Sequence, residues 1–442
     1  MADPRSLALR ILAEADEQHR PSDPLRRQLL ARSGLDARSR RLVTILVQTT
    51  LRWRGRADRV LDGRLSRGLD SLDPAMRSLL RMAYTQLFHL TRIPDYAVVA
   101  TAVTLARTWR GEGKARMVNG VLRGLLAKPP RATDWARGEG VAGLVGELSH
   151  PAWLLERWVA RWGLERTREI CAWNNATPEL HLRARGGAAG AARVAEQLRA
   201  RSIAVESGRL LEEALRLGGA FDAGIDAYIS QGEVTVQDES QMLVAHLWPD
   251  PAAGPVFDLC AAPGTKTTHI AERGPSVRVF GADLAAPRAR EIVASARRLS
   301  LDHLHVIVAD GRCSPLRPIA RRVLLDAPCS SLGVLRRRPD ARWLRSPEAI
   351  RRAAALQEEL LDAAAGLVAP GGWLVYSVCT LEPEETDDRR AAFLAGHRDF
   401  RAAPPPAGLP AELQAGEGIL QILPGVLGME GLYATLLRRD PA

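Results

Sequence analysis

Residues 323–331 read VLLDAPCSS, and residues 374–380 read LVYSVCT. In both stretches an apolar, β-forming run comes first, and a cysteine followed by small hydroxyl residues comes after it. Each cysteine should therefore lie where a strand of a parallel sheet passes into a loop, which is the edge at which open α/β sheets bind ligands. Two thiols, those of Cys329 and Cys379, brought to one edge from different strands indicate covalent chemistry rather than packing.

Strand-like and helical segments alternate regularly around these two stretches. The expected strands cover residues 256–260, 277–283, 304–310, 323–326 and 373–377. Such alternation predicts βαβ units and a mostly parallel, doubly wound sheet. The first four strands each end at or next to an aspartate, and parallel strands present their carboxyl ends at one edge of a sheet. Four carboxylates should therefore converge there, those of Asp258, Asp283, Asp310 and Asp326.

The first expected strand runs into residues 260–268, CAAPGTKTT, a turn of small residues that opens a helix. Small residues let a ligand approach the backbone, and a helix start offers free N–H groups. The turn lacks the patterns of dinucleotide-binding and Walker loops. Asp283 stands where a carboxylate typically binds ribose hydroxyls, and Asp310 could accept a hydrogen bond from an adenine amine. A nucleoside site without phosphates fits S-adenosylmethionine.

The residues before the α/β region form two regions that differ in their pattern of apolar residues. About residues 7–126 carry apolar residues at three- and four-residue spacing, which predicts an all-α bundle. Arginines lie among them, and the pattern leaves open whether they form a solvated face or an RNA-binding face. Mixed helical and strand-like patterns follow and predict a small α/β module. We therefore expect a multidomain chain with a helical domain at 1–135, a small α+β linker domain at 145–235 and an α/β catalytic domain at 236–442.

The charge of the chain indicates its partner. Among 442 residues, 61 lysines and arginines face 51 aspartates and glutamates, which gives a formal net charge of +10. An excess of cations favours a polyanionic partner, and nucleic acid is the first candidate. Arginine codons favoured by a GC-rich genome explain the scarcity of lysine but not the excess of cations. Lys266 is therefore a notable exception, since a retained lysine indicates a need for a compact ammonium group.

Cysteine usage and the N-terminus indicate the compartment. Five cysteines are too few, and odd in number, for a disulfide framework, and they favour a reducing cytosol. The N-terminus lacks the charged and then apolar plan of a signal peptide, and no apolar run approaches the roughly 20 residues that span a bilayer. A soluble, cytoplasmic protein is therefore expected. His150 and His181 have no partners at metal-ligand spacing, so no metal site is expected.

Three blocks, at residues 258–267, 326–330 and 376–385, resemble the signature blocks of RNA cytosine-5 methyltransferases. Within that group the chain most resembles the bacterial RsmB (Sun, Fmu) family, which methylates cytosine in small-subunit ribosomal RNA. The resemblance covers nearly the whole chain. The leading helices, including residues 117–123, are similar to the NusB-type RNA-binding domain of that family, and residues 422–433 match its last strand pair.

The resemblance implies a Rossmann-like catalytic domain that transfers methyl from S-adenosylmethionine to one cytosine C5 in 16S rRNA. It implies that Cys379 adds to C6 of the ring, which lets C5 attack the methyl group. Cys329 would assist release of the product, and Asp326 would hydrogen-bond the N3 and N4 edge of the ring. The partner would be naked rRNA or an early assembly intermediate, and the protein a monomer. The expected cofactor residues are Cys260, Ala261, Ala262, Pro263, Gly264, Thr265, Lys266, Asp283, Asp310 and Asp326.

The chain departs from the family pattern at two positions. Thr265 stands where the family has a glycine, which is tolerable only if its φ is negative. Val378 stands where a threonine usually precedes the nucleophile, so any hydroxyl contact from that residue is lost. The basic segment at residues 336–343 matches a family segment and is expected to contact the RNA backbone.

Three rival functions remain. One is a cytosine-5 methyltransferase acting on tRNA or on another rRNA site. Another is an exocyclic-amine methyltransferase, which needs an aromatic residue where Cys329 stands and no second thiol. The last is a non-catalytic RNA-binding factor that kept the NusB-like domain; it has no use for Cys379 or Asp326, and both are present.

Overall fold

A computed structural model of the protein describes residues 3–90, 93–136, 140–218, 224–249, 254–313, 320–406 and 408–441. The chain forms two compact units. The first unit comprises residues 1–177 and 335–345, and the second comprises residues 178–334 and 346–442. The chain therefore passes between the units three times, and residues 335–345, which we call the strap, belong to the first unit although the second surrounds them in sequence.

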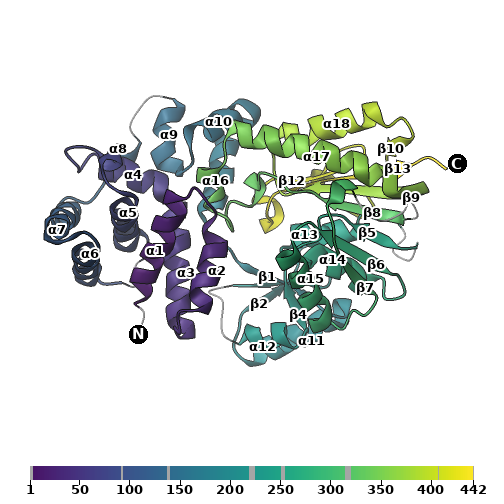
Figure 1. Cartoon of the computed structure of the whole chain (residues 1–442), viewed down its shortest axis with the longest axis horizontal. Helices are drawn as coiled ribbons and strands as arrows, with labels where there is room; N and C mark the ends of the chain where they lie inside the picture. Colours follow the sequence, from purple (N-terminus) through teal and green to yellow (C-terminus); the bar gives the residue numbers. More distant parts are fainter. Residues whose placement is uncertain are drawn as a thin grey trace. The chain divides into compact units, whose positions relative to one another are not determined.

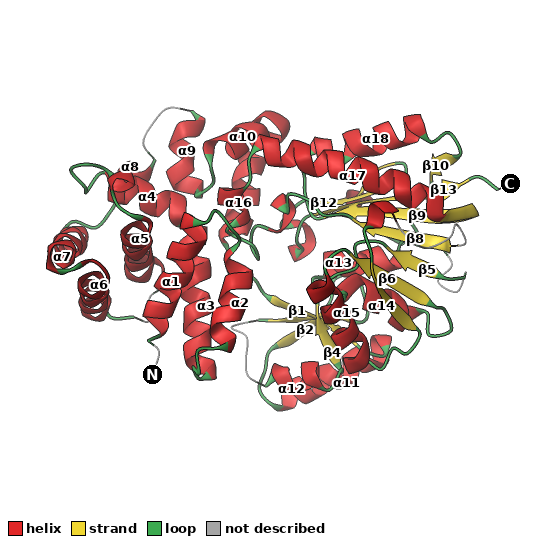
Figure 2. Ribbon diagram, viewed as in Figure 1, coloured by secondary structure: helices red, strands yellow, loops and turns green. Residues whose placement is uncertain are grey.

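The first unit is helical, as the sequence predicts (Figure 2). Aspartates cap several of its helices: the carboxylates of Asp3, Asp36 and Asp73 accept hydrogen bonds from backbone N–H groups that the first turn leaves free. The apolar stripes of the helices pack into one core around Leu9, Leu46 and Leu79. The helices are α1 (Pro4–Glu17), α2 (Ser22–Ala31), α3 (Ala37–Arg52), α4 (Arg54–Asp62), α5 (Pro74–His89), α6 (Asp95–Arg110), α7 (Glu112–Ala127), α8 (Ala132–Trp135), α9 (Val141–Leu148), α10 (Ala152–Asn175) and α16 (Ala341–Leu344), with a 3-10 turn η1 (Leu69–Ser71).

The strap is held inside this unit by its basic residues. Arg342 is fully buried; its guanidinium donates to the carbonyls of Ser149 and Asn174 at 3.0 and 3.2 Å and to Oδ1 of Asn175 at 2.7 Å. Burial lowers the pKa of Arg342 to about 9. The guanidinium of Arg336, 2% exposed, lies over the ring of Trp173 at 3.7 Å. The prediction that this basic segment contacts RNA is therefore wrong for Arg336 and Arg342, because both cations are buried within the protein.

The second unit begins with a small antiparallel sheet, strand order β2-β3-β1-β4. Its strands are β1 (Leu180–Ala184), β2 (Val205–Ser207), β3 (Ala214–Leu217) and β4 (Val234–Val236), and its helices are α11 (Gly187–Ala200) and α12 (Ile225–Ser230). Apolar residues of α11, such as Val194 and Leu198, pack with Leu182 and Leu215 of the sheet. The predicted small module of strands and helices is confirmed.

A larger sheet follows, with the order β11-β12-β13-β9-β8-β5-β6-β7 and β10 paired to β13. Strands β9, β8, β5, β6 and β7 are parallel, and the strands beyond β9 are antiparallel. The predicted doubly wound, mostly parallel sheet is confirmed, with an antiparallel extension. The strands are β5 (Val256–Asp258), β6 (Val279–Asp283), β7 (Leu304–Val308), β8 (Ala320–Asp326), β9 (Val368–Val378), β10 (Phe400–Ala402), β11 (Gln414–Gly416), β12 (Ile419–Ile422) and β13 (Leu432–Arg439).

Helices cover both faces of this sheet (Figure 1). Alternate residues of the central strands point to opposite faces: Leu324 packs in one apolar cluster with Ile270 and Ile292, while Leu325 packs in the other with Leu361. The first face is covered by α14 (Thr265–Arg273) and α15 (Ala286–Arg298), and the second by α17 (Pro347–Leu367) and α18 (Asp387–Gly396). The shorter helical elements are α13 (Glu239–Leu243), η2 (Val244–His246), η3 (Gly311–Cys313), η4 (Leu332–Val334), η5 (Pro383–Glu385), η6 (Ala411–Leu413) and η7 (Val426–Gly428).

The topology places the four predicted aspartates at one edge. Asp258, Asp283 and Asp326 are the last residues of β5, β6 and β8, and Asp310 follows β7 by two positions. In the described part of the chain, no helix combines the length and apolar character needed to cross a membrane.

Candidate active site

The two cysteines of the sequence blocks meet at the carboxyl edge of the parallel sheet. Cys329 follows β8 and Cys379 follows β9, and these neighbouring strands pair in parallel with Asp326 opposite Ser377. The Sγ atoms of Cys329 and Cys379 lie 3.3 Å apart. Both side chains are half-buried, so a ligand can reach them.

The loops that carry the two thiols are fastened to each other. The hydroxyls of Ser330 and Thr380, which each follow a cysteine, are 2.6 Å apart. The backbone N–H of Gly333 donates to the carbonyl of Cys379 at 3.0 Å, and a Cβ at position 333 would meet that oxygen at 3.1 Å. Glycine is therefore needed for this close approach. The hydrogen bond with Cys379 and burial raise the pKa of the Cys329 thiol well above its usual value.

Asp326 and Lys266 form a partly buried ion pair at the same edge of the sheet. The Nζ atom of Lys266 lies 2.7 Å from Oδ2 of Asp326 and 2.6 Å from Oε1 of Gln241, and only 8% of Lys266 is exposed. The other carboxylate oxygen of Asp326 accepts from the hydroxyl of Ser377 at 2.7 Å. The predicted cofactor residue Lys266 thus orients the predicted ring-binding carboxylate, which explains a lysine rather than an arginine at this crowded position.

The predicted cofactor loop, Cys260 to Lys266, joins β5 to α14. Gly264 takes φ of +100°, and a Cβ there would meet Ile292 at 3.2 Å, so this position requires glycine. Thr265 is the first residue of α14 and lies outside the left-handed region, which confirms that its side chain is tolerated at negative φ. Its carbonyl accepts from Arg183 at 2.9 Å. Burial raises the pKa of the Cys260 thiol far above its usual range, so this cysteine is no candidate nucleophile.

Asp258 is the most unusual carboxylate at this edge. It is 1% exposed; Oδ2 accepts from the hydroxyl of Thr267 at 2.6 Å, whereas Oδ1 is buried without a hydrogen-bond partner. Burial raises its pKa to about 7. Buried polar atoms are rarely left unpaired, so this oxygen is an exception at the edge where the sheet binds ligands.

Replacing Asp258 with asparagine is expected to stabilise the ligand-free protein more at high than at low pH. The carboxyl ionises at 3.8 when unfolded but at about 7 when folded, so wild type loses stability as the pH rises between those values. The variant avoids this loss and should gain on the order of 2 kcal/mol relative to wild type between about pH 5 and about pH 8. Urea unfolding of the variant and of wild type at the two pH values measures this difference in the free energy of unfolding.

The matched control for this prediction is Asp310→Asn. Hydrogen bonds from Arg312 lower the pKa of Asp310 to about 2, so its charge is constant over the same pH range. Its difference from wild type should therefore not change between the two pH values. If the Asp258 variant also keeps a constant difference from wild type, the shifted ionisation of Asp258 is refuted.

Asp283 and Asp310 already have partners. One oxygen of Asp283 accepts from the backbone N–H of Ala285 at 3.0 Å, and the other lies 3.5 Å from Arg288. Asp310 is bound by the side chain and the backbone of Arg312, at 2.7 and 2.9 Å. Asp283 lies beside the cofactor loop, since the carbonyl of its neighbour Ala282 accepts from the N–H of Ala261. A ligand that uses Asp310 has to share it with Arg312.

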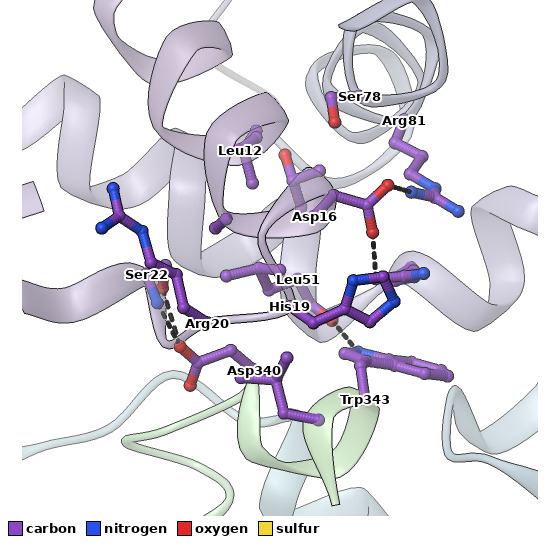
Figure 3. Close-up of a pocket in the computed structure, with 14 residues that line it drawn as sticks. Leu12, Asp16, His19, Arg20, Ser22, Leu51, Ser78, Arg81, Asp340 and Trp343 are labelled. Atoms are coloured by element: carbon purple, nitrogen blue, oxygen red, sulfur yellow. Dashed lines mark hydrogen bonds and ion pairs between the residues drawn. The ribbon is translucent and has the colours of Figure 1, made fainter. Parts of the chain in front are cut away.

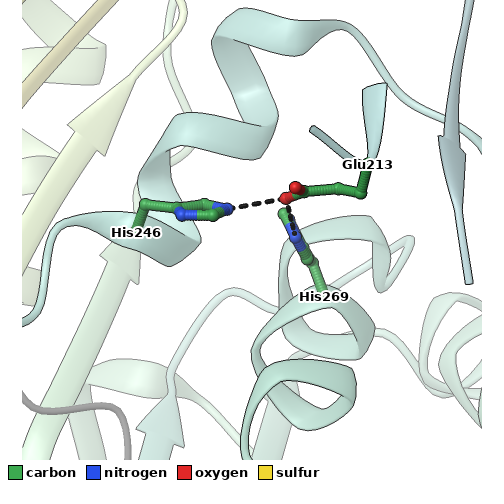
Figure 4. Close-up of side chains that lie close together, drawn as sticks. All are labelled: Glu213, His246 and His269. Carbon is green, nitrogen blue, oxygen red and sulfur yellow. Dashed lines mark hydrogen bonds and ion pairs between the residues drawn. The ribbon is translucent and has the colours of Figure 1, made fainter. Parts of the chain in front are cut away.

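The fold also brings together residues that the sequence patterns do not reveal. Glu213 accepts hydrogen bonds at one oxygen, Oε1, from Nε2 of His246 at 2.7 Å and from Nε2 of His269 at 3.1 Å (Figure 4). Burial lowers the pKa of His269 to about 3. The three donor atoms are close enough to share a cation, but Arg273 Nη1 lies 3.1 Å from the same His246 nitrogen. The cluster fastens the small sheet, through Glu213 just before β3, to α14.

A separate cavity of about 80 Å³ lies in the helical unit (Figure 3). One of its two acidic lining residues, Asp16, is neutralised by Arg54 and Arg81 at 3.0 and 3.3 Å. Two residues of the strap also line it: Asp340 accepts from Ser22, and Trp343 donates to the carbonyl of Leu51. Ion pairs with a structural role line this cavity, and its lining residues include no nucleophile comparable to the cysteine pair.

Comparisons with known proteins agree with this arrangement. Residues 245–438 match the family model for 16S rRNA methyltransferase RsmB/F, residues 2–127 match the NusB family, and residues 150–223 match the ferredoxin-like domain of RsmF/B-like methyltransferases. The ferredoxin-like model covers the small module from β1 to β3, and the NusB model covers most of the helices of the first unit.

Full-length relatives extend the match over the whole chain. A Bacillus subtilis protein with the name "Probable ribosomal RNA small subunit methyltransferase B" is 34% identical over 98% of both chains. The ribosomal RNA small subunit methyltransferase B of Erwinia tasmaniensis is 35% identical over 76% of this chain and 78% of its own. Among solved structures, that of PH0851 superposes with a TM-score of 0.83 at 25% identity over 99% of both chains, and NSun6 from Pyrococcus horikoshii shares the fold with a TM-score of 0.57 at 18% identity over 66% of this chain and 99% of its own. With its NusB-type helices, its ferredoxin-like module and its paired cysteines, the chain belongs to the RsmB/F family of 16S rRNA methyltransferases.

Proposed function

We propose that this protein transfers a methyl group from S-adenosylmethionine to C5 of one cytosine in 16S rRNA, through a temporary bond between Cys379 and C6 of the ring. The observation that carries the proposal is the pair of sulfur atoms 3.3 Å apart at the carboxyl edge of the sheet. The Asp326–Lys266 ion pair at the same edge supplies an oriented carboxylate. Neither packing nor a disulfide framework needs two reduced, half-buried thiols in contact with each other.

The residues at the edge of the sheet fit S-adenosylmethionine. Oδ1 of Asp258 has no partner within the fold, and Gly264 lets the loop turn at positive φ against Ile292. We assign binding of the nucleoside to Asp283 and Asp310, and binding of the methionine part to the loop at residues 260–266 and to Asp326. When bound, S-adenosylmethionine supplies an electrophilic methyl group on a sulfonium sulfur.

Cys379 makes the ring reactive. C5 of cytosine is a weak nucleophile, so the thiolate of Cys379 first forms a bond to C6, and the electron pair of the C5–C6 double bond moves toward C5 and N3. Asp326 would hydrogen-bond the N3 and N4 edge and stabilise this charge, with its orientation fixed by Lys266 and Ser377. C5 would then form a bond to the methyl group, whose bond to the sulfonium sulfur would break to leave a neutral thioether.

Release of the product breaks the bond between C6 and the sulfur of Cys379. The C5–H bond breaks, its electron pair restores the C5–C6 double bond, and the C6–sulfur bond breaks to return Cys379 as a thiolate. We assign assistance in this step to Cys329, because its sulfur lies next to the leaving sulfur. The C5 proton ends in solvent, so one proton is released per methyl group transferred.

The substrate must be an unpaired cytosine, since a thiol reaches C6 only when the base is unstacked. We therefore propose naked 16S rRNA or an early assembly intermediate as the partner, recognised in part by the NusB-type helices. A monomer in the cytoplasm is the form that we expect to act.

Bisulfite sequencing of 16S rRNA tests the proposal. One cytosine should be protected in cells that contain the protein and unprotected in cells that lack it. The purified protein with S-adenosylmethionine should restore protection at the same position on rRNA from the deficient cells. If the protein protects a cytosine in tRNA but none in 16S rRNA, tRNA replaces 16S rRNA as the proposed substrate. If it protects no cytosine in either RNA, the proposed function is refuted.

A further inference from the structure

Two buried polar residues next to the thiols have no part in the chemistry described above. Glu385, in η5, and Gln357, in α17, are both 0% exposed. An isolated carboxylate that leaves water costs several kcal/mol unless donors surround it. Burial of Glu385 therefore costs stability, and its hydrogen bonds show which backbone groups it binds.

These contacts grip the backbone on both sides of Cys329. Oε1 of Glu385 accepts from the N–H of Ser330 at 2.8 Å and from Nε2 of Gln357 at 3.0 Å. The same Nε2 of Gln357 donates to the carbonyl of Pro328 at 2.9 Å. The residue before Cys329 and the residue after it are thus bound by two side chains that also bind each other.

The grip extends to the strand that carries the other thiol. The hydroxyl of Tyr376, on β9 three residues before Cys379, lies 3.0 Å from Oε1 of Gln357 and 2.7 Å from the carbonyl of Glu385. Tyr376 thereby turns the amide of Gln357 so that its NH₂ group faces Pro328 and Glu385. We call Gln357, Tyr376 and Glu385 the loop clamp.

We propose that Glu385 and Gln357 are positioning residues for Cys329, which hold the backbone of its loop so that its sulfur stays next to that of Cys379 during product release. This inference rests on the proposed function. A shift of about 1 Å in a reacting group is enough to slow a reaction about 100-fold, so a fixed loop has a clear use.

The charge of Glu385 adds a second effect. Hydrogen bonding to Cys379 and burial are the main causes of the raised pKa of Cys329, and the negative charges of Cys379 and Glu385 raise it further. Glu385 thus favours the protonated thiol at Cys329. Geometry and charge can be separated, because Gln357 contributes only to the geometry.

The first test follows the covalent adduct in a single turnover of the full-length protein with S-adenosylmethionine and transcribed 16S rRNA. Glu385→Ala, which removes the oxygen that binds Ser330 and Gln357, should slow decay of the adduct at least about 10-fold and change its formation less than about 3-fold. Glu384→Ala, the same substitution one residue earlier in the same turn, should behave as wild type. Gln357→Met should slow decay as Glu385→Ala does, and it keeps the test decisive if Glu385→Ala fails to fold.

The second test needs no RNA. In the Cys379→Ala background, alkylation of Cys329 by iodoacetamide is followed against pH by mass spectrometry of its peptide. Glu385→Gln should lower the pH midpoint by at least about 0.5 unit, whereas Gln357→Met and Glu384→Gln should leave it in place, because the carboxylate remains.

The two tests separate failure of the clamp from failure of the proposed function. If wild type forms no adduct but the alkylation midpoint moves as stated, the proposed function fails and the role of Glu385 at Cys329 stands. The clamp is overturned if wild type methylates RNA, the adduct of Glu385→Ala decays as fast as that of Glu384→Ala, and Glu385→Gln has the same alkylation midpoint as Glu384→Gln. An equal slowing of adduct formation and decay would also overturn it, since that result indicates general loss of structure.

Discussion

Replacing Cys379 with alanine is expected to abolish methyl transfer to RNA, and replacing Cys329 with alanine is expected to leave the protein covalently bound to RNA. Without the Cys379 thiolate, C5 of cytosine stays a weak nucleophile, so the rate should fall at least about 1,000-fold. Without Cys329, attack and methyl transfer still proceed but release is impaired. A protein–RNA band that survives denaturing electrophoresis and requires S-adenosylmethionine measures the second effect.

Two control variants test the roles given to the two cysteines. The double variant lacking both thiols should form no adduct, because the bond to C6 is made by Cys379. Cys313→Ala should turn over as wild type, since Cys313 is an exposed thiol outside the pair. An adduct that persists in the Cys379 variant, or full turnover by that variant, would refute the roles given to both sulfurs.

Replacing Arg342 with methionine is expected to destabilise the helical unit by about 3–5 kcal/mol. Methionine preserves much of the volume but leaves the carbonyls of Ser149 and Asn174 and Oδ1 of Asn175 without their buried donor. Each unpaired acceptor costs about 1–3 kcal/mol. Urea unfolding followed by tryptophan fluorescence should show that the helical unit unfolds at a lower urea concentration than in wild type.

The control for this loss is Arg10→Ala. Arg10 is more than half exposed and pairs with Glu14 one turn away, at 2.6 Å, so its loss should cost less than about 1 kcal/mol. If both variants unfold at the urea concentration of wild type, Arg342 does not hold the strap.

The catalytic half of the molecule could be predicted from the sequence because its signals are local. Each central strand is a short apolar run that ends at an aspartate or leads to a cysteine, and parallel topology alone then brings those ends together. The loop from Cys260 to Lys266 is likewise contiguous. Its departure at Thr265 could be judged from φ alone, because the glycine that needs positive φ is Gly264.

The residues that the sequence did not reveal act across long separations. The arginines of the strap form a cationic run that is typical of an exposed surface, and their burial depends on carbonyls about 170–190 positions earlier, at Ser149 and Asn174. Glu385 and Gln357 look like ordinary polar residues of a turn and a helix. Their role becomes visible only when the fold places them around Pro328 and Ser330.

The strap also decides when during synthesis the helical unit can be completed. Residues 1–177 leave the ribosome first, but the unit also requires residues 335–345, which include the fully buried Leu335 and Arg342. Chains grow at about 5–20 residues per second, so translation of the intervening segment delays the missing piece by roughly 8–35 s. A nascent or truncated chain that ends before the strap lacks the buried Arg342 donors to Ser149, Asn174 and Asn175, so residues 1–177 excised as an independent fragment should be less stable than the same helices in the full chain.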